Sequence, residues 1–292
     1  MKKIKYLDPS IDRKKNLTNQ NFQLIEGTSI PLPSEVEISE SGVCNRKCSF
    51  CPRSDPSFED VNEFIKPKLH SKLIDQLSDL SFKGVIRYSG FVEPLLDKNI
   101  YNLISEVSLK LPKARCEIVT NGDVLNDDRL KKLFANGLST LLISVYDGPE
   151  DAEKFEKMCS KQNLKKEQFV IRHRYYSEEK DFGLTISNRA GMMKNAQYDI
   201  QPLKNSLNLK CYYPSYTFFM DYNGDVLMCP HDWGKKIILG NMNNSSFLDI
   251  WTSKKAIQIR KKLNLADRKF SPCNVCDVKG DLIGKKHAES WK

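Results

Sequence analysis

The chain has 292 residues, and 46 Lys and Arg against 37 Asp and Glu give it a formal net charge of +9 at pH 7. This length accommodates one large domain plus a small one. No apolar run approaches the roughly 20 residues needed to cross a bilayer, and the basic start Met1–Tyr6 lacks the apolar core of a secretory signal. We therefore expect a cytoplasmic protein with no membrane partner.

The basic residues are scattered in small clusters, a distribution typical of a solvated surface. A basic surface also favours an anionic small-molecule substrate. No DNA-reading helix or RNA-binding sheet motif is visible, so we do not expect a nucleic-acid partner.

The first 34 residues are polar and end in Pro31-Leu32-Pro33. About 30 residues are too few for a domain of the usual 50 or more. We expect residues 1–34 to form an N-terminal extension that packs over the main domain.

From residue 35 onward, strand-like and helix-like segments alternate, judged by apolar periodicity. The predicted strands are 35–39, 84–88, 117–120, 141–145 and 169–172, and the predicted helices are 68–80, 97–110, 127–136 and 149–162. Repeated β–α units indicate a parallel sheet. Five or six units fall short of the eight of a closed barrel. We therefore predict an α/β fold, an incomplete (β/α) barrel, over residues 35–204.

Three cysteines, Cys44, Cys48 and Cys51, follow the first predicted strand in a C-x3-C-x2-C run. Together they can wrap one metal centre, but a four-iron cluster needs a ligand at each iron. One iron would stay open, and an open position distinguishes a catalytic metal site from a structural one. A zinc loop or a chance cluster is the alternative that the spacing leaves.

After about residue 200 the pattern changes to that of a small α+β domain, which we place at residues 205–292. Apolar runs flank Asn223-Gly224, the strongest short signal for a hairpin, and residues 246–263 have the spacing of an amphipathic helix. The hairpin would bring the cysteines on either side of it together, and a C-x2-C pair completes four ligands. These cysteines are Cys211, Cys229, Cys273 and Cys276. The spacing alone supports zinc and an iron–sulfur cluster equally.

The first cysteine run, with Phe50 just before its last cysteine, resembles the cluster loop of the radical S-adenosylmethionine (radical SAM) superfamily. The resemblance implies a [4Fe–4S] cluster that binds SAM at its open iron. It also implies cleavage of SAM to a 5′-deoxyadenosyl radical, which abstracts hydrogen from a small-molecule substrate. An electron donor such as flavodoxin or ferredoxin is implied as well.

The second cysteine set resembles the short auxiliary-cluster ("twitch") form of the SPASM domain. Longer relatives carry further cysteines after the C-x2-C pair, and this chain has none after Cys276. The resemblance therefore implies one auxiliary [4Fe–4S] cluster in place of zinc, and it extends over about residues 35–276.

The same resemblance implies which residues contact SAM. They are Phe50, Ser89, Gly90, Glu93, Asn121, Ser144 and Arg189. Arg189, in the run Asn188-Arg189-Ala190-Gly191, is also the candidate catalytic residue, since a guanidinium can clamp the SAM carboxylate or contact the substrate and help remove a proton. Val92 stands where the usual motif has a second glycine, which is a mild departure.

The cysteine spacing and short chain are most similar to the twitch-type dehydrogenases that oxidise an amino-cyclitol. We therefore expect a radical SAM oxidoreductase that dehydrogenates a small hydroxylated substrate, such as a sugar, aminocyclitol or nucleotide sugar, with the auxiliary cluster accepting an electron. The alternatives are a peptide-modifying maturase, a radical epimerase, and a non-enzyme zinc or iron–sulfur regulatory protein.

Overall fold

The structure is a computed structural model of the chain, and it describes residues 11–56, 58–175, 186–195 and 199–291. A single eight-stranded sheet runs through it in the order β5-β4-β3-β2-β1-β6-β7-β8. Strands β1 to β6 are parallel, and β7 and β8 are antiparallel to their neighbours. The strands are β1 Glu35–Ser39, β2 Val85–Tyr88, β3 Arg115–Thr120, β4 Thr140–Val145, β5 Phe169–His173, β6 Thr217–Asp221, β7 Asp225–Leu227 and β8 Ile238–Asn241.

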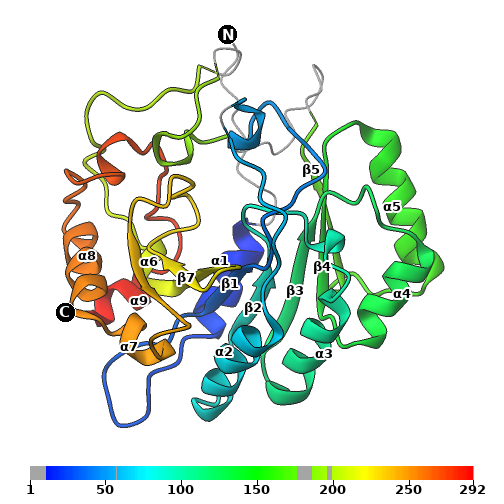
Figure 1. Cartoon of the computed structure of the whole chain (residues 1–292), viewed down its shortest axis with the longest axis horizontal. Helices are drawn as coiled ribbons and strands as arrows, with labels where there is room; N and C mark the ends of the chain where they lie inside the picture. Colours follow the sequence, from blue (N-terminus) through cyan, green and yellow to red (C-terminus); the bar gives the residue numbers. More distant parts are fainter. Residues whose placement is uncertain (1–10, 57, 176–185, 196–198, 292) are drawn as a thin grey trace.

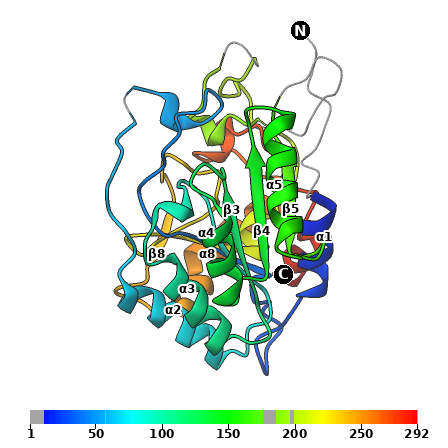
Figure 2. The same cartoon turned by 90° about the vertical axis from the view of Figure 1, so that its right-hand side faces the viewer.

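Helices α2 to α5 follow one another round the outer face of the parallel strands, and α6 to α9 lie together at the left of Figure 1. Figure 2 shows α5 alongside β4 and β5. The helices are α1 Ile11–Gln20, α2 Pro67–Asp79, α3 Ile100–Lys110, α4 Asp127–Ala135, α5 Pro149–Lys161, α6 Tyr213–Tyr216, α7 Phe247–Trp251, α8 Lys254–Asn264 and α9 Lys285–Ser290. In the described residues no helix is both long and apolar enough to span a membrane.

The incomplete barrel is confirmed, because the sheet is open at the edge strands β5 and β8. The predicted strands and helices between residues 35 and 173 are all present. Asn126 caps α4 as a short polar side chain should, accepting a hydrogen bond from the backbone N–H of Arg129. Helix α3 begins three residues later than predicted, because Asp97, which ends the 3₁₀ turn Pro94–Leu96, is extended and its side chain accepts a hydrogen bond from the Asn99 backbone N–H over 2.8 Å.

The predicted hairpin is confirmed as β6 and β7, with Gly224 at φ +89° in the turn. The sequence did not predict that β6 also pairs in parallel with β1, in a register that places Thr217 beside Glu35 and Asp221 beside Ser39. The hairpin therefore extends the sheet of the β–α units instead of standing apart from it. The second cysteine set is therefore connected through β6 to β1, the strand that precedes the first cysteine set.

The single helix predicted over residues 246–263 is wrong. Helix α7 ends at Trp251, and α8 begins at Lys254 after Ser253. The Ser253 side chain accepts a hydrogen bond from the backbone N–H of Ala256, so it starts a new helix. Apolar spacing alone does not reveal this break, because both helices bury apolar residues at helical spacing. Those of α7 lie in the main core, whereas Ile259 and Leu263 of α8 pack in the cluster around the second cysteine set.

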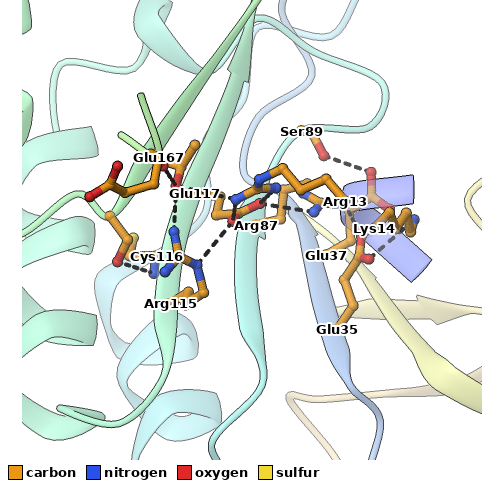
Figure 3. A network of polar contacts seen from close by, with 12 residues as sticks. Arg13, Lys14, Glu35, Glu37, Arg87, Ser89, Arg115, Cys116, Glu117 and Glu167 are labelled. Carbon is orange, nitrogen blue, oxygen red and sulfur yellow. Dashed lines mark hydrogen bonds and ion pairs between the residues drawn. The ribbon is translucent and has the colours of Figure 1, made fainter. Parts of the chain in front are cut away.

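The interior face of the sheet carries a buried ladder of alternating charges. Glu37, Arg87 and Glu117 are neighbours in register on β1, β2 and β3. Helix α1 covers them and contributes Arg13, which pairs with Glu117, and Lys14, which pairs with Glu35 (Figure 3). Arg87 pairs with both Glu35 and Glu117. Charges buried this deeply are tolerated only when each has partners, so α1 is part of the core of the sheet.

Replacing Glu117 with glutamine should destabilise the fold by about 3 kcal/mol, because the buried Arg87 loses one of its two carboxylate partners and Arg13 loses its ion pair. Burial raises the pKa of Glu117, but Arg87 and Arg13 outweigh it and hold the pKa at about 2, below the ordinary 4.5. The stabilisation is therefore complete above pH 4.5 and is lost as the pH falls toward 2. In urea unfolding, the penalty of Glu117→Gln should be large at pH 7 and much smaller at pH 3.

The matched control is Glu153→Gln, because Glu153 forms an exposed pair with Lys157 on α5. An exposed pair contributes at most about 1 kcal/mol, so this variant should unfold almost as the parent does. A Glu117→Gln penalty no larger than that of the control, or one that is equal at both pH values, would contradict the role given to the ladder.

Candidate active site

The first cysteine set lies on the loop that leaves the carboxyl end of β1. Cys44, Cys48 and Cys51 are each half-buried, and the loop turns tightly, with the Cys51 backbone N–H donating to the Cys48 carbonyl over 2.9 Å. Burial raises the pKa of the Cys48 thiol to about 11, and the neighbouring thiols add to the rise. A metal that binds here must displace these protons, because only thiolates are ligands.

Two residues between the cysteines tie this loop to the ends of other strands. Arg46 bridges the carboxylates of Asp123 and Asp147, which follow β3 and β4, with nitrogen–oxygen distances of 2.7 and 3.0 Å. Asn45 donates to Asp123 over 2.7 Å. The loop is therefore held across the mouth of the barrel by residues that the ligand spacing did not single out.

Arg53, just after Cys51, fixes the other end of the loop. It is buried and donates to the carbonyls of Phe91 and Gly42 over 2.8 and 2.7 Å, and it pairs with Asp60. The only signal in the sequence is an arginine beside a metal-ligand motif, which by itself is also typical of a solvated surface.

The predicted SAM contact Glu93 is buried and bonded within the protein. Its carboxylate accepts from the Thr120 hydroxyl over 2.6 Å, from the Asn121 backbone N–H over 2.7 Å and from the Leu95 backbone N–H over 3.1 Å. Burial raises its pKa to about 7, although these hydrogen bonds oppose the rise. In this geometry Glu93 orients the end of β3, and its predicted contact with SAM stays a prediction.

Ser89 and Gly90 end β2 at the same edge of the sheet. The Ser89 hydroxyl donates to Glu37 over 2.6 Å. Gly90 adopts φ +96°, and a Cβ there would press on the ring of Phe219. Glycine is required at this position for both reasons.

Asn121, Ser144 and Phe50 also meet at this edge. The Asn121 side chain donates to Asn45 in the cysteine loop over 2.8 Å. Tyr146, two residues after Ser144, packs against the Phe50 ring at a centroid distance of 5.1 Å. A pocket of about 270 Å³ opens beside them, with walls that include Arg46, Asn121, Tyr146 and Lys154.

The second cysteine set converges as the hairpin predicted. Cys211, Cys229, Cys273 and Cys276 are between 6% and 9% exposed and line one pocket with Tyr213, His231 and Arg268. A Cβ at Gly280 would overlap the Cys211 sulfur, so the backbone there is close against the thiol. The remaining cysteines, Cys116 and Cys159, are buried in β3 and α5, away from both sets.

The stretch around Arg189 connects the two sets. Asn188 is fully buried; its side chain donates to the Val275 carbonyl, between Cys273 and Cys276, over 2.7 Å. Arg189 and Ala190 both adopt positive φ, 47° and 53°, a strained conformation for residues with a Cβ.

The Arg189 side chain lies close to the first set and to Asp277, the residue that follows the second set. Its guanidinium lies 6.0 Å from the centre of the Trp233 ring. Burial raises the pKa of Cys51, and the Arg53 backbone N–H and the charge of Arg189 oppose the rise, which places Arg189 within electrostatic reach of Cys51. Its Nε is buried and has no hydrogen-bond partner among the described residues, so a donor remains for a ligand.

Comparison with known proteins agrees with this geometry. Residues 38–179 match the model of the radical SAM superfamily, and residues 211–277 match SPASM, an iron–sulfur cluster-binding domain. The chain is 31% identical over 245 residues to an S-adenosyl-L-methionine-dependent 2-deoxy-scyllo-inosamine dehydrogenase of Niallia circulans, which covers 84% of this chain and 92% of that enzyme. The chain belongs to the radical SAM superfamily.

Further similarities of this radical SAM enzyme are consistent with that assignment. The crystal structure of BtrN in complex with AdoMet and 2-DOIA superposes with a TM-score of 0.72 at 29% identity, covering 85% of this chain and 94% of that one. A GTP 3′,8-cyclase of Clostridium perfringens (strain 13 / Type A) is 25% identical over 228 residues, or 76% of this chain and 63% of that enzyme. The chain is therefore a radical SAM oxidoreductase that uses SAM and two [4Fe–4S] clusters.

The donor sets fit these clusters. Within the described residues, no three His, Cys, Asp or Glu side chains are close enough to hold a single metal ion. A four-iron cluster places each thiolate on a different iron, so its ligands surround a cavity and need not converge on one point. When bound, the first cluster and SAM supply a 5′-deoxyadenosyl radical, the chemistry that no side chain provides.

Proposed function

We propose that this enzyme dehydrogenates an aminocyclitol or a closely related small polyhydroxylated alcohol to the ketone. The observation that carries the proposal is the 31% identity to a 2-deoxy-scyllo-inosamine dehydrogenase over 92% of that enzyme. Oxidising an alcohol to a ketone removes one hydrogen atom from the carbinol carbon, one proton from the hydroxyl and one further electron. The two cysteine sets allow the radical to form at one cluster and the electron to be accepted at the other.

In this proposal Cys44, Cys48 and Cys51 hold the SAM-binding cluster, and the four buried cysteines of the C-terminal part hold the auxiliary one. The solvent exposure of the cysteines supports this assignment, because the first three are half-buried and the other four are almost fully buried. A site that binds a ligand needs an open position, whereas a site that only passes electrons does not. SAM would lie among Phe50, Ser89, Gly90, Glu93, Asn121, Ser144 and Arg189.

Arg189 is the proposed catalytic residue. It lies between the two sets, and its buried Nε has no partner among the residues that the structure describes. In this proposal it holds the SAM carboxylate or assists loss of the hydroxyl proton. We also propose that the protein is cytoplasmic, where thiolates stay reduced, and that a flavodoxin or ferredoxin donates the electron. We propose three parts of the chain: an N-terminal extension at residues 1–34, the partial barrel at 35–204 and the auxiliary-cluster domain at 205–292.

The test is anaerobic incubation of the reconstituted enzyme with SAM, a reductant and 2-deoxy-scyllo-inosamine. We expect 5′-deoxyadenosine and the ketone in equal amounts. GTP and a cysteine-containing peptide are the matched comparisons, because both are substrates of other radical SAM chemistry. Turnover of either comparison with none of the aminocyclitol would refute the proposal, and an isomeric alcohol as the product would show an epimerase.

A further inference from the structure

A fully buried arginine lies next to the second cysteine set. Arg268 is 1% exposed and lines the pocket formed by the four thiols. Its Nη2 donates to the Val278 carbonyl over 2.9 Å, but its Nε and Nη1 are buried and have no hydrogen-bond partner in the part of the chain that the structure describes. None of the carboxylates in the described residues forms an ion pair with it.

The other fully buried arginine of this region has more contacts, although its Nη2 also lacks a hydrogen-bond partner among the described residues. Arg260, on α8, stacks between the rings of Trp251 and Trp291, 3.8 and 4.0 Å from their centres. It donates to the carbonyls of Pro214 and Trp251 over 2.7 and 2.6 Å. Arg268 has neither an aromatic sandwich nor a second carbonyl, and its neighbours are sulfur atoms.

An arginine stays charged in proteins, and a buried charge without a partner costs several kcal/mol. An anion in the pocket between the thiols would supply the partner that Arg268 lacks among the described residues. A four-iron cluster with four thiolates carries about two negative charges in its oxidised form, and its potential depends on nearby charge and on hydrogen bonds to its sulfurs. The position of Arg268, its two free N–H groups and its charge all match that anion.

We propose that Arg268 is the internal counter-charge of the auxiliary cluster and raises its reduction potential, which favours transfer of the substrate electron to that site. The inference depends on the ligand assignment proposed above. It does not depend on which alcohol is oxidised. Arg268 is a positioning and tuning residue in this account, since it contacts no reacting atom of the substrate.

The test measures a potential in the full-length chain. Replacing Cys44, Cys48 and Cys51 with alanine leaves the auxiliary cluster as the one signal in an EPR-monitored redox titration. In that background we expect Arg268→Gln to lower the midpoint potential by about 59 mV or more, a tenfold change in a one-electron equilibrium constant. Arg268→Lys, which keeps the charge, should recover most of the shift. Lys269→Gln removes an equal charge from an exposed neighbour and should leave the midpoint unchanged.

Iron analysis precedes each titration. Arg268→Gln with a full cluster and an unchanged midpoint would overturn the inference. Loss of iron in Arg268→Gln with retention in Arg268→Lys would support it, because charge is what the two variants do not share. Loss in both would count against it. A reference chain that holds no cluster would refute the ligand assignment together with the inference, and the iron content reveals that case before any variant is compared.

Discussion

Cys48→Ala is expected to abolish SAM cleavage and to reduce the iron content from about eight to about four atoms per chain, one four-iron cluster being lost. Cys48 is the middle cysteine of the half-buried set, which we propose as the ligands of the SAM-binding cluster, and two thiolates cannot hold a cluster that normally has three. Enzymes accelerate reactions by at least about 10⁶-fold, and here the acceleration comes from the cofactor. Formation of 5′-deoxyadenosine should therefore fall to the level of a protein-free control.

The matched control is Cys159→Ala, which removes a buried thiol from α5 outside both cysteine sets. It should keep about eight irons and cleave SAM as the parent does. Deoxyadenosine formation by Cys48→Ala at a rate near that of this control would show that the three-cysteine loop is not the SAM site.

Cys276→Ala should separate radical formation from product formation. Cys276 lies in the nearly closed second set, beside the carbonyl of Val275 that anchors Asn188. Without a complete auxiliary site the substrate electron has no acceptor. Dehydrogenation should fall at least about 100-fold, because even the outer partners of metal ligands cost 10–100-fold. Deoxyadenosine should still form, now without a matching amount of ketone.

The measurement is the ratio of the two products at equal protein concentration, with the iron content determined on the same sample. The Cys159→Ala control should keep the ratio at one. Cys276→Ala that lacks about four irons and still forms ketone and deoxyadenosine in equal amounts would exclude an electron-accepting role for the second set.

Local spacing was sufficient to predict much of this molecule. The β–α periodicity of residues 35–173 predicted the parallel strands, because each strand and helix buries its own apolar face. The Asn223-Gly224 turn predicted the hairpin that brings Cys211 and Cys229 together. Both depend on neighbours within about ten residues, which a single sequence displays.

Contacts between distant segments were not predictable in this way. The pairing of β6 with β1 joins residues far apart in the chain, and nothing in either strand indicates its partner. Arg46 and Arg53 are ordinary basic residues in the sequence. They fix the cysteine loop only because the fold brings hydrogen-bond acceptors to them: Asp123 and Asp147 for Arg46, and the Gly42 carbonyl for Arg53. Whether an arginine is solvated or buried is decided by tertiary packing.

The most direct test of the central claim follows one hydrogen atom. 2-Deoxy-scyllo-inosamine carrying deuterium at the carbinol carbon that becomes the ketone is incubated anaerobically with the reconstituted enzyme, SAM and reductant. The deoxyadenosine is then analysed by mass spectrometry. The account predicts one deuterium in each deoxyadenosine molecule and one molecule of ketone for each. Ketone formed together with unlabelled deoxyadenosine would contradict it.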